Sequence, residues 1–215
     1  MKNSDWIAYW NSAAKKNNNN IVFQNGYQGK LSFMPDSSLE LLVKSIVRYL
    51  DLDKNDLLLD VGCGSGMLTI PLADYVEKIV GVDAAEQMIL KMPKTIKSHL
   101  AKADNLPFEK NSFDKLLCHS IFQYFPDIKY SEMVISEMKR IVKPNGRIYI
   151  VDVPDKSKME DYNKNKKEED HDLSRIFYDK MFFLEMLREA ITFDNELEGY
   201  GNSKYRFNVL FNNLK

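Results

Sequence analysis

The stretch Leu57-Leu58-Leu59-Asp60-Val61-Gly62-Cys63-Gly64-Ser65-Gly66 decides how the rest of this chain is interpreted: an apolar run ends at an acid, and a glycine follows at every second position. A short run that is apolar on both faces is typical of a central parallel strand covered by helices. The glycines after it allow a sharp turn and let a ligand lie against bare backbone. The amphipathic segment 67–76 predicts a helix whose first turn offers free N–H groups to that ligand. Without a ligand, the same glycines predict only a tight turn between strand and helix.

The spacing of the glycines narrows the choice of ligand. The dinucleotide-binding fingerprint is G-x-G-x-x-G, whereas this chain reads D-x-G-x-G-x-G and has Met67 three positions after Gly64. This spacing disfavours a nicotinamide cofactor. A second apolar run ends at Asp83, about 23 residues after Asp60, at the place where such folds bind a ribose through its hydroxyl groups.

Together these residues resemble the cofactor site of the class I S-adenosylmethionine (SAM)-dependent methyltransferases, whose first motif has the same D-x-G-x-G-x-G form. The resemblance extends from Ser37 to the C-terminus, and the quinone-biosynthesis methyltransferases are among the enzymes to which the chain is similar. It implies SAM as the cofactor and S-adenosylhomocysteine (SAH) as its product. The N-terminal segment and the residues after the fifth expected strand match none of the family's motifs.

Apolar periodicity along the chain alternates between strands and helices. Expected strands cover residues 57–61, 79–83, part of 99–106, 113–118, 147–153, 191–197 and 205–211. Expected helices cover residues 4–16, 37–50, 67–76, 84–92, 130–142 and 176–190. Repeated βαβ units predict an α/β fold with a doubly wound, mostly parallel sheet and helices on both faces. The resemblance implies a Rossmann-like sheet of seven strands, closed by a C-terminal antiparallel hairpin.

Two local signals place element boundaries. Ser37, with Glu40 three residues later, predicts a capping box at the start of a helix. Asn145 stands in the turn before the fifth expected strand, where the family more often has a glycine. Asparagine tolerates the left-handed conformation, so we expect the turn to be kept.

The chain length and the distribution of charge predict the domain organisation. The 215 residues are enough for one sizeable α/β core and too few for two, so we expect a single methyltransferase domain over residues 1–215. Residues 1–35 lie outside the expected core and are interpreted as a cap or lid. Residues 154–175 carry mixed charges and few apolar side chains, which predicts a solvated flap after the fifth strand.

Charge and cysteine content argue against several classes of protein. The formal net charge of −1 lacks the basic excess of a nucleic-acid or membrane-surface binder. Cys63 and Cys118 have no partner at zinc-site spacing, and Asp152 with Asp155 lacks a third ligand, so no metal is expected. No apolar run approaches the roughly 20 residues needed to cross a bilayer, and residues 1–20 are too polar for a signal peptide. These features predict a cytoplasmic protein, monomeric or homodimeric, that acts on a small molecule.

The expected site lies outside the carboxyl ends of the parallel strands, where ligands of doubly wound sheets bind. The resemblance implies that Asp60 and the loop backbone hold the methionyl end of SAM, and that Asp83 holds its ribose. The implied cofactor-binding residues are Asp60, Gly62, Cys63, Gly64, Asp83, Ala84, Met88, Asp104, Asn105, Leu106 and Cys118. Plainer interpretations exist for three of them: Asp104 as a turn acid, Met88 as a core residue, and Cys118 as a small buried apolar side chain.

The acceptor side of the site is predicted from residues near the same strand ends. A neutral hydroxyl nucleophile loses its proton as the methyl bond forms, which favours a nearby base with a pKa near 7. His119, at the end of the fourth expected strand, is the candidate catalytic base, although its main chain alone could close the cofactor pocket. Candidate substrate residues are Tyr9, Trp10, Tyr27, Gln123, Tyr124, Arg175 and Tyr178. Aromatic side chains with a polar end suit a lid that excludes water, whereas Trp6 is interpreted as a packing residue and His171 as a surface residue.

The sequence therefore predicts a SAM-dependent methyltransferase that methylates a hydroxyl or phosphate oxygen of a small polar metabolite, for example a sugar or a phosphorylated precursor. The polar side chains His119, Gln123, Tyr124 and Arg175 favour this acceptor over a long-chain quinone. Two alternatives stay open. One is a quinone- or lipid-type C- or O-methyltransferase, and the other is a non-catalytic SAM-binding partner subunit with an exposed apolar docking face.

Overall fold

The computed structural model describes residues 3–15, 20–27, 33–165 and 175–214. Its α-helices are α1 Asn3–Lys15, α2 Ile21–Gln24, α3 Asp36–Leu50, α4 Thr69–Leu72, α5 Glu86–Ile89, α6 Ile128–Ile141, α7 Met159–Asn165 and α8 Lys180–Met186. Its strands are β1 Leu57–Val61, β2 Lys78–Asp83, β3 Lys97–Leu100, β4 Phe113–His119, β5 Val142–Pro154, β6 Ile191–Asp194 and β7 Arg206–Asn212. Its 3₁₀ helices are η1 Ala73–Tyr75, η2 Phe122–Tyr124, η3 Lys156–Lys158 and η4 Ser203–Tyr205. Within these ranges, no helix is long and apolar enough to span a membrane.

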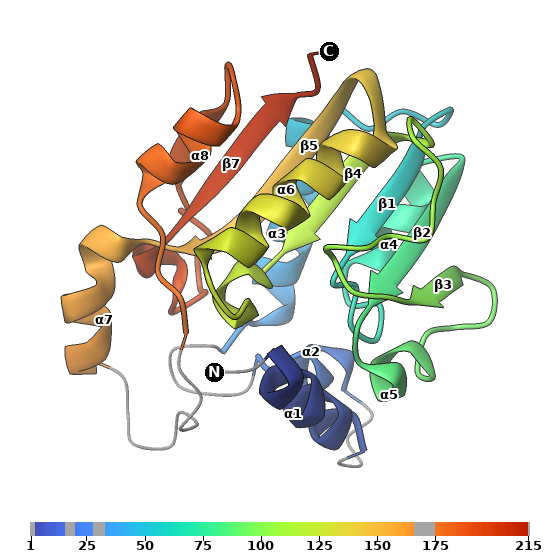
Figure 1. Cartoon of the computed structure of the whole chain (residues 1–215). Helices are drawn as coiled ribbons and strands as arrows, with labels where there is room; N and C mark the ends of the chain where they lie inside the picture. Colours follow the sequence, from blue (N-terminus) through green and yellow to red (C-terminus); the bar gives the residue numbers. More distant parts are fainter. Residues whose placement is uncertain (1–2, 16–19, 28–32, 166–174, 215) are drawn as a thin grey trace.

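The strands form one seven-stranded sheet in the order β3-β2-β1-β4-β5-β7-β6 (Figure 1). Strands β3, β2, β1, β4 and β5 pair in parallel, and β7 runs antiparallel to both β5 and β6. This confirms the predicted mostly parallel α/β sheet with an antiparallel C-terminal hairpin. The strand order reverses between β1 and β4, so the carboxyl ends of these two strands mark the place where such sheets bind ligands.

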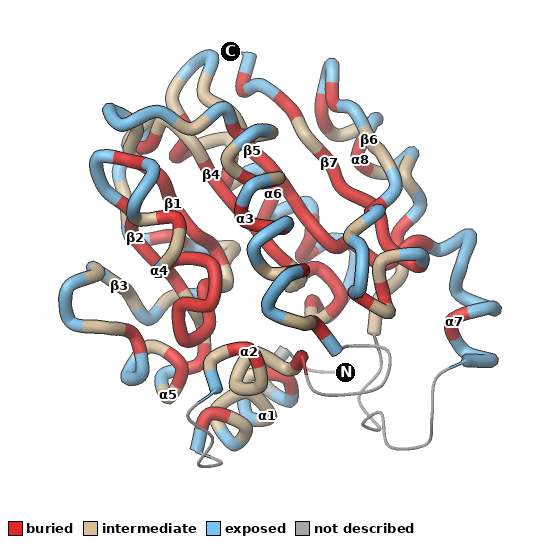
Figure 2. The backbone as a smooth tube through the Cα atoms, turned by 180° about the vertical axis from the view of Figure 1, so that it is seen from behind, coloured by how far each residue is buried: buried red, intermediate tan, exposed pale blue. Residues whose placement is uncertain are grey.

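Two apolar cores cover the two faces of the sheet. Alternate side chains of a strand point to opposite faces, so Leu59 and Leu116 pack with α6 and α8, while Leu58 and Leu117 pack with α3 and α4. All four leucines are completely buried, and burying one such side chain stabilises the fold by roughly 2 kcal/mol. Figure 2 shows the centre of the sheet as a continuous buried region. The two cores therefore fix the register that aligns the strand ends.

The helices beside the glycine-rich loop are shorter than their apolar periodicity predicts. The segment 67–76 forms only the four-residue α4, which contains Pro71, and the short η1. Proline removes a backbone donor and fits only the first turn of a helix. Likewise, α5 covers only four of the residues 84–92. Because so few peptide dipoles align in α4, the expected contribution of a helix dipole to ligand binding is small.

Other local expectations differ from the structure in instructive ways. The capping box is wrong: α3 begins at Asp36 after Pro35, with no side-chain cap, and Ser38 instead donates to the Glu198 carbonyl oxygen. The expected helix 176–190 is reduced to α8, because the Asp179 side chain caps a later start by accepting from the Met181 N–H.

The turn before β5 and the segment after it also have defined structures. Asn145 adopts the expected left-handed conformation with φ of +63°. The predicted flap 154–175 contains η3 and α7, whose Tyr162 is buried, and its residues 166–174, including His171, lie outside the described residues. Residues 156–165 are therefore helical and not a loop, although all of them except Tyr162 are exposed, as expected of a solvated flap.

The N-terminal helices lie across the carboxyl ends of the strands, beside α5 (Figure 1). The Asn11 side chain accepts a hydrogen bond of 2.9 Å from the Gln87 N–H at the start of α5. Ala14 is fully buried against Ala85 and Met88. This docking holds the aromatic side chains of α1 above the end of the sheet.

Candidate active site

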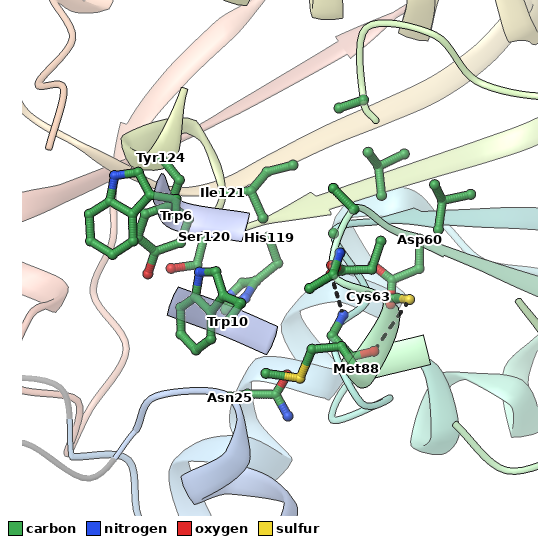
Figure 3. Close-up of a pocket in the computed structure, with 18 of the residues that line it drawn as sticks. Trp6, Trp10, Asn25, Asp60, Cys63, Met88, His119, Ser120, Ile121 and Tyr124 are labelled. Atoms are coloured by element: carbon green, nitrogen blue, oxygen red, sulfur yellow. Dashed lines mark hydrogen bonds between the residues drawn. The ribbon is translucent and has the colours of Figure 1, made fainter. Parts of the chain in front are cut away.

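A pocket of about 1000 Å³, counting the open space at its mouth, lies where β1, β2 and β4 end. Its walls come from the glycine-rich loop, the turn after β2, the residues after β4 and the two N-terminal helices. Figure 3 shows two parts: Asp60 and Cys63 on one side, and Trp6, Trp10, Tyr124, Ser120 and His119 on the other. Ligand pockets of this size and mixed lining are typical of small-molecule sites.

The glycine-rich loop needs its glycines for the expected sharp turn and also for close contacts with two side chains. Gly62 and Gly64 have φ of +80° and +55°, which side-chain-bearing residues rarely adopt. A Cβ on Gly62 would lie 2.3 Å from Ile121 Cγ2, and one on Gly64 would lie 2.0 Å from Asn25 Oδ1. The bare backbone thus makes room for two side chains that close the pocket, as well as for the turn itself.

Two carboxyl groups define the electrostatics on the loop side. Asp60 is buried and accepts a hydrogen bond of 2.6 Å from Thr69 Oγ1. Burial raises its pKa to about 7, with Asp83 adding to the effect and Thr69 opposing it. Asp83 accepts from the Gly64 N–H at 2.9 Å and the Ala85 N–H at 2.8 Å, and burial raises its pKa as well. A cation in this part of the pocket would stabilise both ionised carboxylates.

Aromatic rings form the opposite side of the pocket. The ring centroids of Trp6 and Tyr124 lie 4.4 Å apart. Those of Trp10 and Tyr124 lie 5.5 Å apart, with an angle of 69° between the two ring planes. Trp6 is only 4% exposed, as expected of a packing residue, and it also forms part of the pocket wall. Tyr9 contacts both indoles edge-on but is not part of the lining.

His119 lies between the two sides, at the end of β4. It is 8% exposed, and its Nδ1 atom lies 3.4 Å from the Tyr27 hydroxyl. Burial lowers the pKa of His119 to about 4, and the charge of Arg206 acts in the same direction, whereas Asp152 opposes them. The imidazole is therefore neutral at pH 7 and can accept a proton.

The structure brings most of the predicted site residues to one pocket. Those in its lining are Asp60, Gly62, Cys63, Gly64, Asp83, Ala84, Met88, His119, Trp10, Tyr27 and Tyr124. Asp104 is one contact away, because it accepts a hydrogen bond of 2.7 Å from the hydroxyl of Tyr130, which does line the pocket.

The remaining predicted cofactor residues, Asn105, Leu106 and Cys118, lie outside the lining. The Leu106 N–H already donates to Glu137 Oε1 at 2.8 Å, so it is not available to an adenine, and Asn105 is also outside the lining. Cys118 is fully buried in the core on the α6 side of the sheet.

Three predicted substrate residues have structural partners instead of facing the pocket. Gln123 is buried and bonds to Ser120 and Arg206. The Tyr178 hydroxyl lies 2.7 Å from Ser131 Oγ and donates to the Phe122 carbonyl oxygen within the core. Arg175 donates to the Tyr162 hydroxyl. Their polarity reflects these internal hydrogen bonds, which the sequence pattern did not reveal.

Several lining residues were not predicted. Asn25 bonds through its side-chain nitrogen to Ser65 Oγ at 2.9 Å, which ties the N-terminal segment to the glycine-rich loop. Ser120 and Ile121 follow directly after β4. The position of Ser120 just beyond a strand end was a usable signal, whereas nothing in the sequence around Asn25 indicates its contact. Among the described residues, no group of three His, Cys, Asp or Glu side chains could hold a metal ion.

Residues 59–150, which include the glycine-rich loop, Asp83 and His119, match the protein family described as a methyltransferase domain. Over this region the chain is similar to class I SAM-dependent methyltransferases. The chain is 28% identical over 174 residues to the sterol 4-C-methyltransferase of Caenorhabditis elegans, covering 73% of this chain and 50% of the relative. It is 33% identical over 116 residues to a demethylmenaquinone methyltransferase of Bacillus cereus, covering 49% of this chain and 48% of the relative. The chain spans about half the length of the curated relatives it matches.

Solved methyltransferase structures share the fold. A SAM-dependent methyltransferase from Methanosarcina mazei superposes with a TM-score of 0.64 and 20% identity, covering 79% of this chain and 97% of the other. Phosphoethanolamine N-methyltransferase 1 of Haemonchus contortus, in complex with phosphoethanolamine and SAH, superposes with a TM-score of 0.75 and 14% identity. That match covers 98% of this chain and 48% of the other.

The chemistry of the pocket fits SAM, the cofactor of the methyltransferases to which the chain is similar. SAM carries a sulfonium and an ammonium group, and the lining holds the carboxyl groups of Asp60 and Asp83 but no lysine or arginine among the residues the structure describes. The Asp83 carboxylate accepts from the backbone N–H groups of Gly64, Ala85 and Ala84, which leaves one of its roughly four lone-pair positions for a ribose hydroxyl.

Proposed function

We propose that the chain transfers a methyl group from SAM to a hydroxyl oxygen of a small acceptor bound on the aromatic side of the pocket. The observation that carries this proposal is the continuity of one pocket. It joins two carboxyl groups beside a glycine-rich loop to a neutral, buried histidine among aromatic rings. The first part suits a cationic cofactor, and the second suits an uncharged nucleophile that loses a proton.

The proposed cofactor residues divide by the part of SAM that they suit. Bound SAM supplies a methyl group that is already activated by the sulfonium, so the protein has to position the acceptor and exclude water. Asp60 and the backbone of residues 62–64 would hold the methionyl end, and Asp83 the ribose. Ala84 and Met88 would line the adenine, with Asp104 and Tyr130 beside it.

His119 would take the acceptor's proton as the methyl bond forms. In its neutral state Nε2 can take the proton when Nδ1 carries the ring hydrogen and donates it to the Tyr27 hydroxyl 3.4 Å away, a contact that also orients the ring. The resulting imidazolium gains stability from the charge of Asp152, which already raises the pKa of His119 against the effect of burial. A base that is neutral at pH 7 can accept the proton, but a pKa of about 4 lies below the value near 7 that favours a general base, so the step depends on Asp152 stabilising the imidazolium.

The N-terminal segment, residues 1–35, would act as a lid on a single methyltransferase domain. In support, Trp6 and Trp10 of α1 line the pocket, and Asn25 binds the loop through Ser65. Aromatic side chains over a reaction site exclude water, which favours methyl transfer to the acceptor over hydrolysis.

The lining favours some acceptors over others. The described lining residues include no lysine or arginine to pair with a phosphate, so a hydroxyl-bearing acceptor has more support than a phosphorylated one. The rings of Trp6, Trp10 and Tyr124 also favour an acceptor with a flat apolar part, which keeps a quinone- or lipid-type acceptor as the second candidate. Relatives named for sterol and demethylmenaquinone substrates agree with that second candidate.

Calorimetry and a methyl-transfer assay together test the proposal. We expect SAM and SAH to bind and NAD to show no binding, and we expect radiolabelled methyl to pass from SAM to at least one alcohol or phenol in an acceptor panel. SAH binding without turnover of any acceptor would favour the non-catalytic partner subunit. Absence of SAM and SAH binding would refute the proposed function altogether.

A further inference from the structure

Polar side chains at two adjacent strand ends lie beside His119 and the pocket. Ser120 follows β4, and its N–H donates to the Val151 carbonyl oxygen at 2.9 Å, next to Asp152 of β5. Ser120 and Asp152 have φ of +56° and +65°. Left-handed conformations are costly for residues other than glycine and persist where surrounding contacts enforce them, often at functional sites. The contacts of these two residues therefore call for a functional explanation.

The Asp152 carboxylate is completely buried within a polar cluster. It accepts from Ser120 Oγ at 2.7 Å, Tyr200 OH at 3.2 Å and Asn195 Nδ2 at 3.2 Å. Arg206, 4% exposed, places its Nε 4.0 Å from the same carboxylate. A buried ion pair is weak evidence of a stabilising role, because the desolvation of both charges offsets their attraction. An effect on the neighbouring pocket is a better explanation of the cluster.

The direction of each hydrogen bond at Ser120 Oγ follows from its partners, because a serine hydroxyl has one proton and two lone pairs. The proton goes to Asp152, since a carboxylate only accepts. One lone pair accepts from Gln123 Nε2 at 2.9 Å, and Arg206 fixes the orientation of this amide by donating to Gln123 Oε1 at 3.3 Å. The Tyr27 phenol is also hydrogen-bonded to the Ser120 side chain. Only the second lone pair is left for this contact, so the phenol is the donor.

The same reasoning determines which ring nitrogen of His119 carries the hydrogen. Burial raises the pKa of the Tyr27 phenol, so the phenol keeps the single proton that it donates to Ser120. Its contact of 3.4 Å with His119 Nδ1 is then a hydrogen bond only if Nδ1 donates. In the neutral ring, the lone pair is therefore on Nε2. This nitrogen bonds to none of the described residues and is not sealed from solvent, and His119 lines the pocket.

We propose that Tyr27, Ser120 and Asp152 are positioning residues that hold His119 as its Nδ1–H tautomer and leave Nε2 free for the methyl acceptor. The inference deepens the proposed function and rests on it for the role of His119 as the base. The hydrogen bonds from His119 through Tyr27 and Ser120 to Asp152 form a row in which every donor points towards the carboxylate. When Nε2 takes the acceptor's proton, this row stabilises the charge of the imidazolium, and no proton has to move along it.

The tautomer can be measured directly, without SAM or a methyl acceptor. In long-range proton–nitrogen NMR correlation spectra, an imidazole nitrogen that carries hydrogen and one that carries a lone pair give separate signals. At pH 7 we expect a neutral His119 ring with its hydrogen on Nδ1. The chain has two other histidines, His99 and His171, and the signals missing from His119→Gln identify those of His119. A hydrogen on Nε2, a mixture of the two tautomers, or a charged ring at pH 7 would overturn the proposal.

Two tyrosine-to-phenylalanine variants separate the row from its surroundings. Tyr27→Phe keeps the buried ring but removes the group that accepts from Nδ1, so we expect both tautomers of His119 in the spectrum. Tyr200→Phe is the control, because it removes a hydroxyl that donates to the same Asp152 oxygen as Ser120 does but is not part of the row. This control should keep the Nδ1–H tautomer. An unchanged tautomer in Tyr27→Phe, or the same change in both variants, would overturn the proposal.

Asp152→Asn should reverse the row, a result that a purely structural role would not produce. Asn195 and Arg206 face Oδ1 of the carboxylate, so the new amide oxygen should take that place and the amide nitrogen should donate to Ser120. Each later hydrogen bond of the row then changes direction, and the ring hydrogen of His119 moves to Nε2. Retention of the Nδ1–H tautomer would contradict the proposal. If this variant unfolds, the two phenylalanine variants decide the question.

Turnover links the tautomer to catalysis. Asp152→Asn should lower methyl transfer roughly 10²-fold, as much as loss of the base, because the lone pair no longer faces the acceptor. A reversed tautomer with unchanged turnover would overturn the positioning role. Loss of SAH binding in the unmodified protein would instead count against the methyltransferase proposal. Because the tautomer is measured without any ligand, the two failures are distinguishable.

Discussion

The affinity for SAM should depend on pH because Asp60 is buried next to the proposed methionyl site. Burial raises the pKa of Asp60 to about 7, so below that pH the carboxyl group is mostly protonated in the free protein. A bound cation favours the ionised form, and binding therefore releases a proton. The affinity for SAM therefore rises as the pH rises through 7, and it levels off above that pH. For a single linked proton with this pKa, the Kd at pH 6 should be about tenfold larger than at pH 8.

Isothermal titration of SAM and SAH between pH 5.5 and 8.5 measures this dependence. Repeating the titration at pH 6.5 in buffers of different ionisation enthalpy should reveal the release of about three quarters of a proton per ligand. Asp60→Asn removes the titrating group and should give a flat profile with weaker binding at pH 8. A pH-independent Kd in the unmodified protein, or the same slope in the Asn variant, would refute the assignment of the cation site to Asp60.

Three further substitutions test separate parts of the site. His119→Ala should lower turnover roughly 10²-fold while leaving SAH affinity within about twofold; unchanged turnover in a methyl-transfer assay would remove His119 from the mechanism. Gly64→Ala should weaken SAH binding at least tenfold, because its Cβ would lie 2.0 Å from Asn25 Oδ1 at a φ of +55°. Calorimetry of the double variant Gly64→Ala with Asn25→Ala should show that part of the SAH affinity is recovered. Asp83→Asn should weaken SAH binding about tenfold through loss of charge-assisted hydrogen bonds, and equal affinities for the two proteins would argue against a ribose at this residue.

The sheet could be predicted from the sequence because its signals are local. The run from Leu57 to Val61 is buried on both faces, and the pairing of β1 with β2 and β4 follows the expected parallel order. Helix lengths were less predictable. The apolar periodicity of residues 67–76 predicted a helix over the whole segment. The α-helix α4 ends after Leu72, because Pro71 and the short turn into β2 interrupt it.

The cofactor side of the pocket was also visible in the sequence, because Asp60, the glycines and Asp83 sit at strand ends that parallel pairing brings together. The acceptor side depends on contacts between distant segments. Gln123 was predicted to face the substrate because of its position after β4. Instead, Arg206, 83 residues later, donates a hydrogen bond to Gln123 Oε1 and holds the side chain in a buried position. Likewise, the Ser120 hydroxyl donates to Asp152 on the neighbouring strand, a contact that no local pattern indicates.

The most direct test of the whole account is a crystal structure of the protein with SAH. The account predicts SAH in the pocket at the ends of β1, β2 and β4, with its ribose hydroxyls on Asp83 and its sulfur directed towards the side that holds His119 and Ser120. SAH bound elsewhere, or bound in this pocket with its ribose away from Asp83, would contradict the assignment of the site.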